Sequence, residues 1–138
     1  MSLIKKINKS LSNFFDKIIE KHKPTELDII RDTIEDSMFA MTEKYGLKAI
    51  TLATIDGFVI ASTSNTASDD AAKYSYILSQ HRDMDIQGAL ILVKEGIYVD
   101  YVDFAETEVV CIISSKETLQ TEKLEKIKND VKNILIKV

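Results

Sequence analysis

The chain has 138 residues, of which 45% are hydrophobic and 29% charged, and this balance excludes a disordered chain. Its single cysteine, Cys111, excludes an intramolecular disulfide and a cysteine-based zinc site. The net charge of −4 is unevenly divided, because residues 1–23 carry +4 and the remainder carries −8. An acidic body does not suit binding to nucleic-acid phosphates. No apolar run is long enough to span a membrane and no secretion signal is evident, so we expect a cytoplasmic protein.

The first 23 residues predict an amphipathic helix. Apolar side chains recur there at alternating spacings of three and four, as on one face of a helix. Pro24 ends the pattern, because the residue before a proline is disfavoured in a helix. We therefore expect an N-terminal helix, residues 1–23, followed by one domain, residues 24–138. The apolar stripe of the helix is Ile4, Ile7, Leu11, Phe14 and Ile18.

The domain begins with a predicted helix that has Thr25 as its N-cap, with Asp28 three residues later, and that runs to Tyr45, where Gly46 ends it. Two β-rich segments follow, residues 47–55 and 58–62. They are joined by Asp56-Gly57, a dipeptide typical of a two-residue hairpin turn.

A helix from Asp69 to His81 comes next, with Ser68 as the expected N-cap and acidic residues in its first turn. Three strands follow at residues 87–94, 97–104 and 108–114, separated by tight turns. The chain ends in another amphipathic helix. Its predicted apolar stripe is Leu124, Ile127, Val131, Ile134 and Val138.

Two of these strands, at residues 89–93 and 109–113, are continuously apolar, and continuous runs indicate burial on both faces of a sheet. Tight turns join them, so the sheet is expected to be antiparallel. The sequence therefore predicts an α/β (α+β) fold with three α/β/α layers around a five-stranded antiparallel sheet.

The search for catalytic chemistry finds little. The four glycines are too dispersed for a nucleotide-binding loop, and His22 and His81 lie on different helices. Cys111 sits in an apolar strand, as a buried thiol would. We expect no catalytic residue, no cofactor and no metal, and hence not an enzyme. Acidic residues around the last hairpin are predicted to be a solvated surface, or alternatively an acidic docking surface. They are Asp100, Asp103, Glu106 and Glu108.

The run from Gly46 to Ser62 resembles the first hairpin of roadblock domains, which also has a glycine, an apolar strand, an Asp-Gly turn and a strand ending Ala-Ser. Asp69-Asp70-Ala71-Ala72 is similar to the acidic, alanine-rich helix start of that family. The predicted order of elements from residue 25 to 138 matches as well. The family includes the dynein light chains of that name and MglB-type bacterial regulators. The resemblance implies a profilin-like roadblock architecture and the binding and regulation of a Ras-like small GTPase. It also implies a homodimer or higher even oligomer, or an assembly with similar domains.

The resemblance also implies that the third strand forms a sheet edge that pairs with its copy, and that the middle helix packs against its copy. An apolar edge strand is an aggregation hazard unless it is paired. On the middle helix, small side chains (Ala72, Ser75, Ser79) form one strip and larger ones another; one strip must face the sheet and the other is a candidate partner surface. The predicted dimer-interface residues are Ala89, Ile91, Val93, Tyr74, Ile77, Leu78 and His81.

Residues 1–23 leave three alternatives open. The helix packs back on the domain or dimer, docks in a groove of a partner, or lies on an anionic membrane surface. The residues expected to meet a membrane or partner are Lys5, Lys6, Lys9, Phe14 and Phe15.

We therefore expect a dimeric, non-enzymatic regulator or scaffold of a Ras-like GTPase, with GTPase activation as one form of that regulation. The alternative is a profilin-like or longin-like sensor, or a membrane-associated adaptor module.

Overall fold

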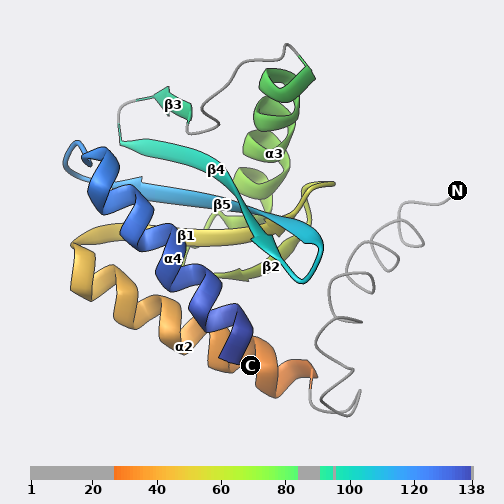
Figure 1. The fold of residues 1–138 in the computed structure, drawn as a ribbon, viewed down its shortest axis with the longest axis vertical. Coiled ribbons are helices and arrows are strands. Elements are labelled where there is room, and N and C mark those ends of the chain that lie inside the picture. Colours follow the sequence, from red (N-terminus) through yellow and green to blue (C-terminus); the bar gives the residue numbers. More distant parts are fainter. Residues whose placement is uncertain (1–26, 84–90, 95, 138) are drawn as a thin grey trace, which may run out of the picture.

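The computed structural model describes residues 27–83, 91–94 and 96–137 (Figure 1). The helix predicted for residues 1–23 lies outside these ranges. None of the helices in the described ranges has the length and apolar character needed to cross a membrane.

The described chain forms an antiparallel sheet of five strands in the order β2-β1-β5-β4-β3, together with three helices. The predicted α+β class and the antiparallel sheet are confirmed. The helices are α2 (Leu27–Tyr45), α3 (Ala67–Asp83) and α4 (Thr121–Lys137). The strands are β1 (Leu47–Thr54), β2 (Val59–Ser62), β3 (Ile91–Lys94), β4 (Ile97–Phe104) and β5 (Thr107–Ser115).

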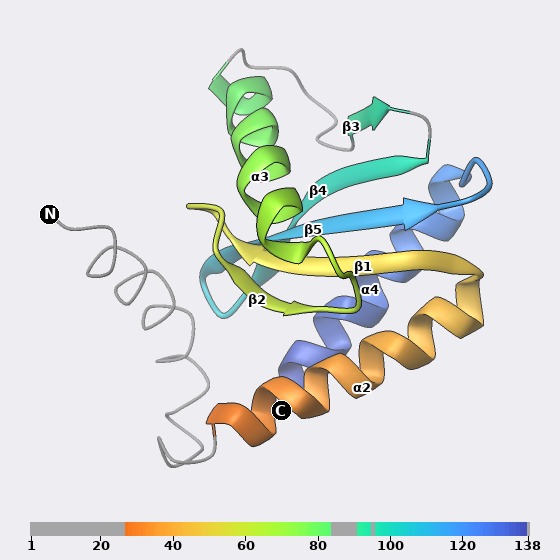
Figure 2. The ribbon, with the colours of Figure 1, turned by 180° about the vertical axis from the view of Figure 1, so that it is seen from behind.

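The helices divide unequally between the two faces of the sheet. Of the three described helices, α3 lies across one face of the sheet, and α2 and α4 lie against the other (Figure 2, seen from behind). Strand β5 contributes side chains to the hydrophobic cores on both faces of the sheet. Val109, Cys111 and Ile113 join the cluster under α2 and α4, whereas Val110 and Ile112 join the cluster under α3. The predicted burial of this strand on both faces is confirmed, because successive side chains of a strand point to opposite faces.

The first hairpin has a three-residue loop, residues 55–57, and not the predicted two-residue turn. The Thr54 N–H donates to the Phe58 carbonyl (2.8 Å), and the Gly57 N–H donates to the Thr54 carbonyl (2.9 Å). Gly57 has φ +91°, so the loop ends in the left-handed residue that three-residue hairpins require. A Cβ at this position would lie 3.1 Å from the Cα of Ala72. The glycine therefore also lets α3 lie directly against the hairpin.

Helix α3 begins two residues earlier than predicted, and Ser68 is not its N-cap. The Asp70 N–H donates to the Thr66 carbonyl (3.0 Å), and the Thr66 hydroxyl donates to the Asp70 carboxylate (2.7 Å). The Thr66 N–H is in turn held by the Ser64 hydroxyl (3.1 Å). Thr66 is thus the residue that leads into the helix, and Ser68 lies in the first turn.

In α4 the predicted stripe holds at Leu124, Ile127 and Val131, which are buried. Its fourth member differs, because Leu135 is buried while Ile134 is only half-buried. The spacing of three, four and four residues follows the pitch of the helix more closely. Val138, the fifth predicted member, lies outside the described residues.

Candidate functional site

Strand β3 lies at one edge of the sheet, where the resemblance to roadblock domains places it. It pairs with β4 through Ile91↔Val99 and Leu92↔Tyr98, and no described strand lies along its other side. Ala89 and the side chains of Ile91 and Val93 lie outside what the structure describes. Their part in a dimer interface therefore stays a prediction.

The larger strip of α3 faces the sheet. Tyr74 and Leu78 are 4% and 1% exposed and belong to the cluster formed with Val99 and Ile112. Ile77 is half-buried against the same cluster, and the side chain of His81 is not among those described. Long side chains fill the space between helix and sheet, so in this structure Tyr74 and Leu78 are core residues of one chain and not a free surface.

The other side of α3 presents Ala72, Tyr76 and Ser79, which we call the outer α3 face. Tyr76 is 63% exposed, and its hydroxyl accepts a hydrogen bond from the Gln80 amide (2.9 Å). Ser75, predicted to share a strip with Ala72 and Ser79, is instead buried on the sheet side. Sequence reasoning missed Tyr76, although its i+4 spacing from Ala72 was a signal that could have found it.

A hollow of about 290 Å³ lies beside the start of α3, on the face of the sheet that this helix only partly covers. Hydroxyl groups dominate its polar lining, and one lysine lies at its border. The polar residues that line it are Lys48, Thr51, Ser64, Thr66, Asp70 and Ser114.

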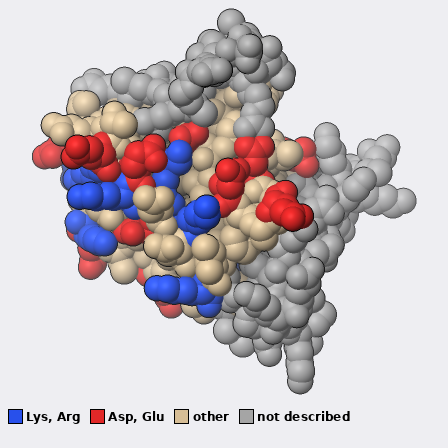
Figure 3. All heavy atoms as spheres, viewed as in Figure 1, with Lys and Arg blue, Asp and Glu red and all other residues tan. Residues whose placement is uncertain are grey.

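A second, larger groove of about 400 Å³ runs between α2 and α4 on the opposite face. Ala40, Met41 and Ile134 contribute its apolar part. On this side of the molecule, basic side chains gather on the left with acidic ones among them, and only acidic side chains appear toward the right (Figure 3). A groove between two helices is a shape that accepts a third helix.

One end of this groove is closed by a charged cluster that ties α2 to α4. The Asp130 carboxylate accepts from the Tyr45 hydroxyl (2.5 Å) and from the Lys44 ammonium (3.1 Å). The hydrogen bond from Tyr45, together with that from Lys44, lowers the pKa of Asp130 although burial opposes the shift. Burial, and then the hydrogen bond to Asp130, raises the pKa of Tyr45. The cluster therefore holds an ionised carboxylate between two donors at neutral pH.

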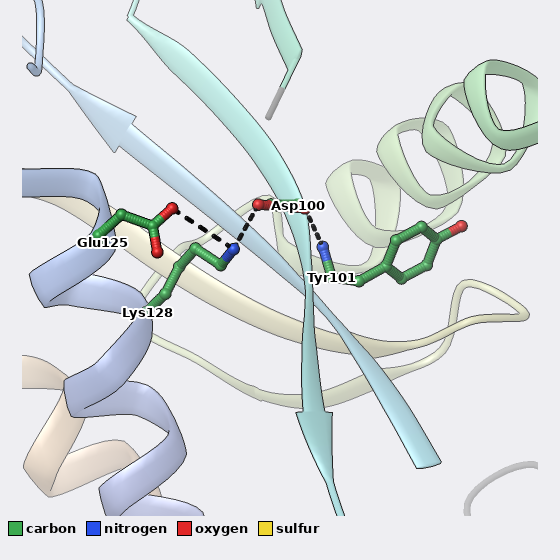
Figure 4. A network of polar contacts seen from close by, with 4 residues as sticks. All are labelled: Asp100, Tyr101, Glu125 and Lys128. Carbon is green, nitrogen blue, oxygen red and sulfur yellow. Dashed lines mark hydrogen bonds and ion pairs between the residues drawn. The ribbon is translucent and has the colours of Figure 1, made fainter. Parts of the chain in front are cut away.

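A buried ion pair joins α4 to the sheet (Figure 4). The Lys128 ammonium donates to the Asp100 carboxylate at 2.6 Å, with side-chain exposures of 21% and 10%. The other Asp100 oxygen accepts from the Tyr101 N–H (2.7 Å), and Glu125 lies 3.9 Å from the ammonium. Burial alone would lower the pKa of Lys128, but its bond to Asp100 and the nearby negative charges raise it. The prediction of Asp100 as a solvated surface residue is wrong, because its side chain points under α4, while Asp103 on the same strand is exposed.

Cys111 lies close to this pair in the core. Burial, assisted by the charge of Asp100, raises the pKa of its thiol to about 12. The thiol is therefore protonated at neutral pH and unsuited to act as a nucleophile. Within the described ranges, no group of three or more His, Cys, Asp or Glu side chains could hold a metal ion.

These features define an α+β domain with an antiparallel sheet. Among the helices that the structure describes, two lie on one face of this sheet and one lies on the other. Among solved structures, the chain is similar to Myxococcus xanthus MglB, with a TM-score of 0.49 and 13% sequence identity, over 77% of this chain and 90% of that one. A similarity at this level carries no argument about function. No protein-family model matches the chain, and no curated protein matches it.

Proposed function

We propose that this chain is a roadblock-type regulator or scaffold that forms a homodimer and binds a Ras-like small GTPase, without enzymatic activity of its own. The observation that carries the proposal is the position of β3 at an edge of the sheet. The residues that resemble roadblock domains form the hairpin β1–β2 and the start of α3, which contact each other at Gly57.

The geometry suits pairing by two-fold symmetry. An edge strand carries unpaired backbone groups that can accept another strand, and a two-fold axis closes such an assembly at two copies. Both views place β3 and the last turns of α3 at the same end of the domain (Figures 1 and 2). Pairing of β3 with its copy would extend the sheet across the pair and place both α3 helices on the same face of the joined sheet.

The dimer is tested with Ile91→Arg in β3, measured by sedimentation equilibrium with circular dichroism as a check of the fold. We expect a folded monomer, or an insoluble protein, because pairing of β3 with its copy would remove the arginine charge from water. Ile55→Arg is the matched control, since Ile55 is exposed in the hairpin loop away from this edge. A soluble Ile91→Arg dimer would show that β3 is not the interface.

The GTPase role is tested by affinity capture from a lysate of the source organism, with the purified full chain as bait. We expect enrichment of a Ras-like GTPase, whose purified form then binds the chain with an affinity that differs between its GDP and GTP forms. Hydrolysis rates with and without the chain separate activation from scaffolding. If only copies of the chain itself return, the dimer stands and the GTPase role fails.

The alternative of a ligand sensor is favoured by one observation, the polar hollow beside α3. Its volume of about 290 Å³ is near the lower end of small-molecule sites. Native mass spectrometry of gently purified protein would reveal a retained ligand, and Thr51→Val should release it. The membrane-adaptor alternative is tested by liposome flotation: it predicts that the full chain floats with the liposomes and that the chain without residues 1–23 does not.

A further inference from the structure

β2 forms the second edge of the sheet, and its pairing with β1 fixes which of its backbone groups face outward. In an antiparallel pair, the groups of alternate residues face the neighbouring strand, and those of the residues between face away. The Thr63 N–H, directly after β2, donates to the Ile50 carbonyl of β1 (3.0 Å). Ser62, which directly precedes Thr63, therefore directs its backbone groups away from β1. Ile60 lies where the register of the β1–β2 pairing shifts, between Ala61 and Val59, so the alternation does not fix its direction.

Two side chains of α2 bind backbone groups of Ile60 and Ser62. The Arg31 Nε–H donates to the Ile60 carbonyl (2.9 Å), and the Glu35 carboxylate accepts from the Ser62 N–H (2.8 Å). Arg31 and Glu35 are four residues apart, so they project from the same side of α2. One supplies a donor and the other an acceptor, which is the pair of partners that an added strand would supply.

The two edges of the sheet thus differ. We propose that Arg31 and Glu35 form a side-chain cap that closes the β2 edge to a second copy of this chain. Self-association is thereby confined to β3 and ends at a closed pair, a consequence that rests on the proposed dimer. Two self-pairing edges on opposite sides of one sheet would instead link copies without limit, and proteins commonly block one edge against this outcome.

The cap is tested with the double variant Arg31→Ala/Glu35→Ala, which removes both partners and leaves the net charge unchanged. Glu122→Ala/Lys126→Ala on α4 is the matched control, because it deletes an acid and a base four residues apart at exposed positions. The weight-average mass is measured by sedimentation equilibrium over a hundredfold range of concentration. We expect one discrete mass for wild type and control. For the capless variant we expect a mass that rises with concentration to at least twice the wild-type value.

The conservative variant Arg31→Lys/Glu35→Gln keeps a donor and an acceptor, and should retain the wild-type mass. If the capless variant folds, as judged by circular dichroism, and keeps the wild-type mass throughout, the cap is refuted. A wild-type monomer with a dimeric capless variant would support the cap and refute pairing through β3, so the two proposals fail separately.

If the double variant does not fold, the single change Glu35→Ala keeps the proposal testable. Hydrogen exchange of the Ser62 amide should then become at least tenfold faster than in wild type, because its acceptor is gone. Unchanged protection of that amide would overturn the cap.

Discussion

Replacing Tyr76 by alanine tests whether the outer α3 face meets a second copy of the chain. Tyr76 is 63% exposed in the single chain. An aromatic side chain buries about 150–250 Å² when fully covered, so covering the exposed part would remove about 120 Å² from water. At about 25 cal/mol per Å², this is worth about 3 kcal/mol per copy. Side-chain ordering and imperfect packing offset part of this free energy, so we count half of it, about 1.5 kcal/mol per copy.

A symmetric pair contains the contact twice, so Tyr76→Ala should weaken dimerisation by about 3 kcal/mol, or roughly a hundredfold in Kd. Sedimentation equilibrium measures this change. The fold of the monomer should survive, because changes at exposed positions usually alter stability by less than about 0.5 kcal/mol. Phe39→Ala is the control, since Phe39 is 53% exposed on α2, against the other face of the sheet. A Kd for Tyr76→Ala within twofold of wild type, or an equal loss for Phe39→Ala, would refute the assignment of this face.

Three further predictions concern the fold that supports these surfaces. Gly96→Ala should lower the free energy of unfolding, measured with urea, by more than about 2 kcal/mol, because φ is +83° and the added Cβ would clash with a main-chain oxygen of β5. Gly46→Ala is the control: its φ is +66°, but no atom lies near the added Cβ, so the loss should be only about 1 kcal/mol. Removing either partner of the Asp100–Lys128 pair should cost about 2–4 kcal/mol, and a double-mutant cycle should return a coupling of at least about 1 kcal/mol; additive losses would refute the pair as a stabilising contact. The pKa of Asp130 is lower in the folded protein than its ordinary value of 3.8, so ionised Asp130 stabilises the fold above pH 3.8, and this contribution is lost as the pH falls through the pKa of the folded state. Asp130→Asn should therefore reduce the dependence of the unfolding free energy on pH in this acidic range. An unchanged pH dependence in the variant would contradict this.

Sequence reasoning succeeded where the signal is local. The 3.6-residue periodicity located α2 and α4, and the continuous apolar run at residues 109–113 indicated a strand buried on both faces. Gly57 marked the first hairpin because only a residue that tolerates positive φ ends such a loop. The length of that loop was wrong by one residue, since Asp-Gly occurs in both two-residue and three-residue hairpins.

Sequence reasoning failed where an element distant in the chain decides whether a side chain is buried. Asp100 looked like one more acid near the last hairpin, yet Lys128, 28 residues later, brings it into the core beneath α4. Tyr74 and Tyr76 lie two positions apart on one helix, and only the position of the sheet decides that the first is buried and the second exposed. A charge or a tyrosine in sequence therefore predicts neither its partner nor its face.

The cap on β2 illustrates the same limit of sequence reasoning and makes the two edges of the sheet different. In the sequence, Arg31 and Glu35 are an ordinary pair of opposite charges four residues apart, which favours a salt bridge on a helix surface. In the structure each binds a backbone group of β2, across 29 and 27 residues of chain. Two half-buried charged side chains of α2 thus take the place of a neighbouring strand at one edge, while the other edge ends in four residues of β3 with no described strand beyond them. An assembly that must present a fixed number of copies to a partner needs this inequality, because two equal edges would produce a chain of variable length.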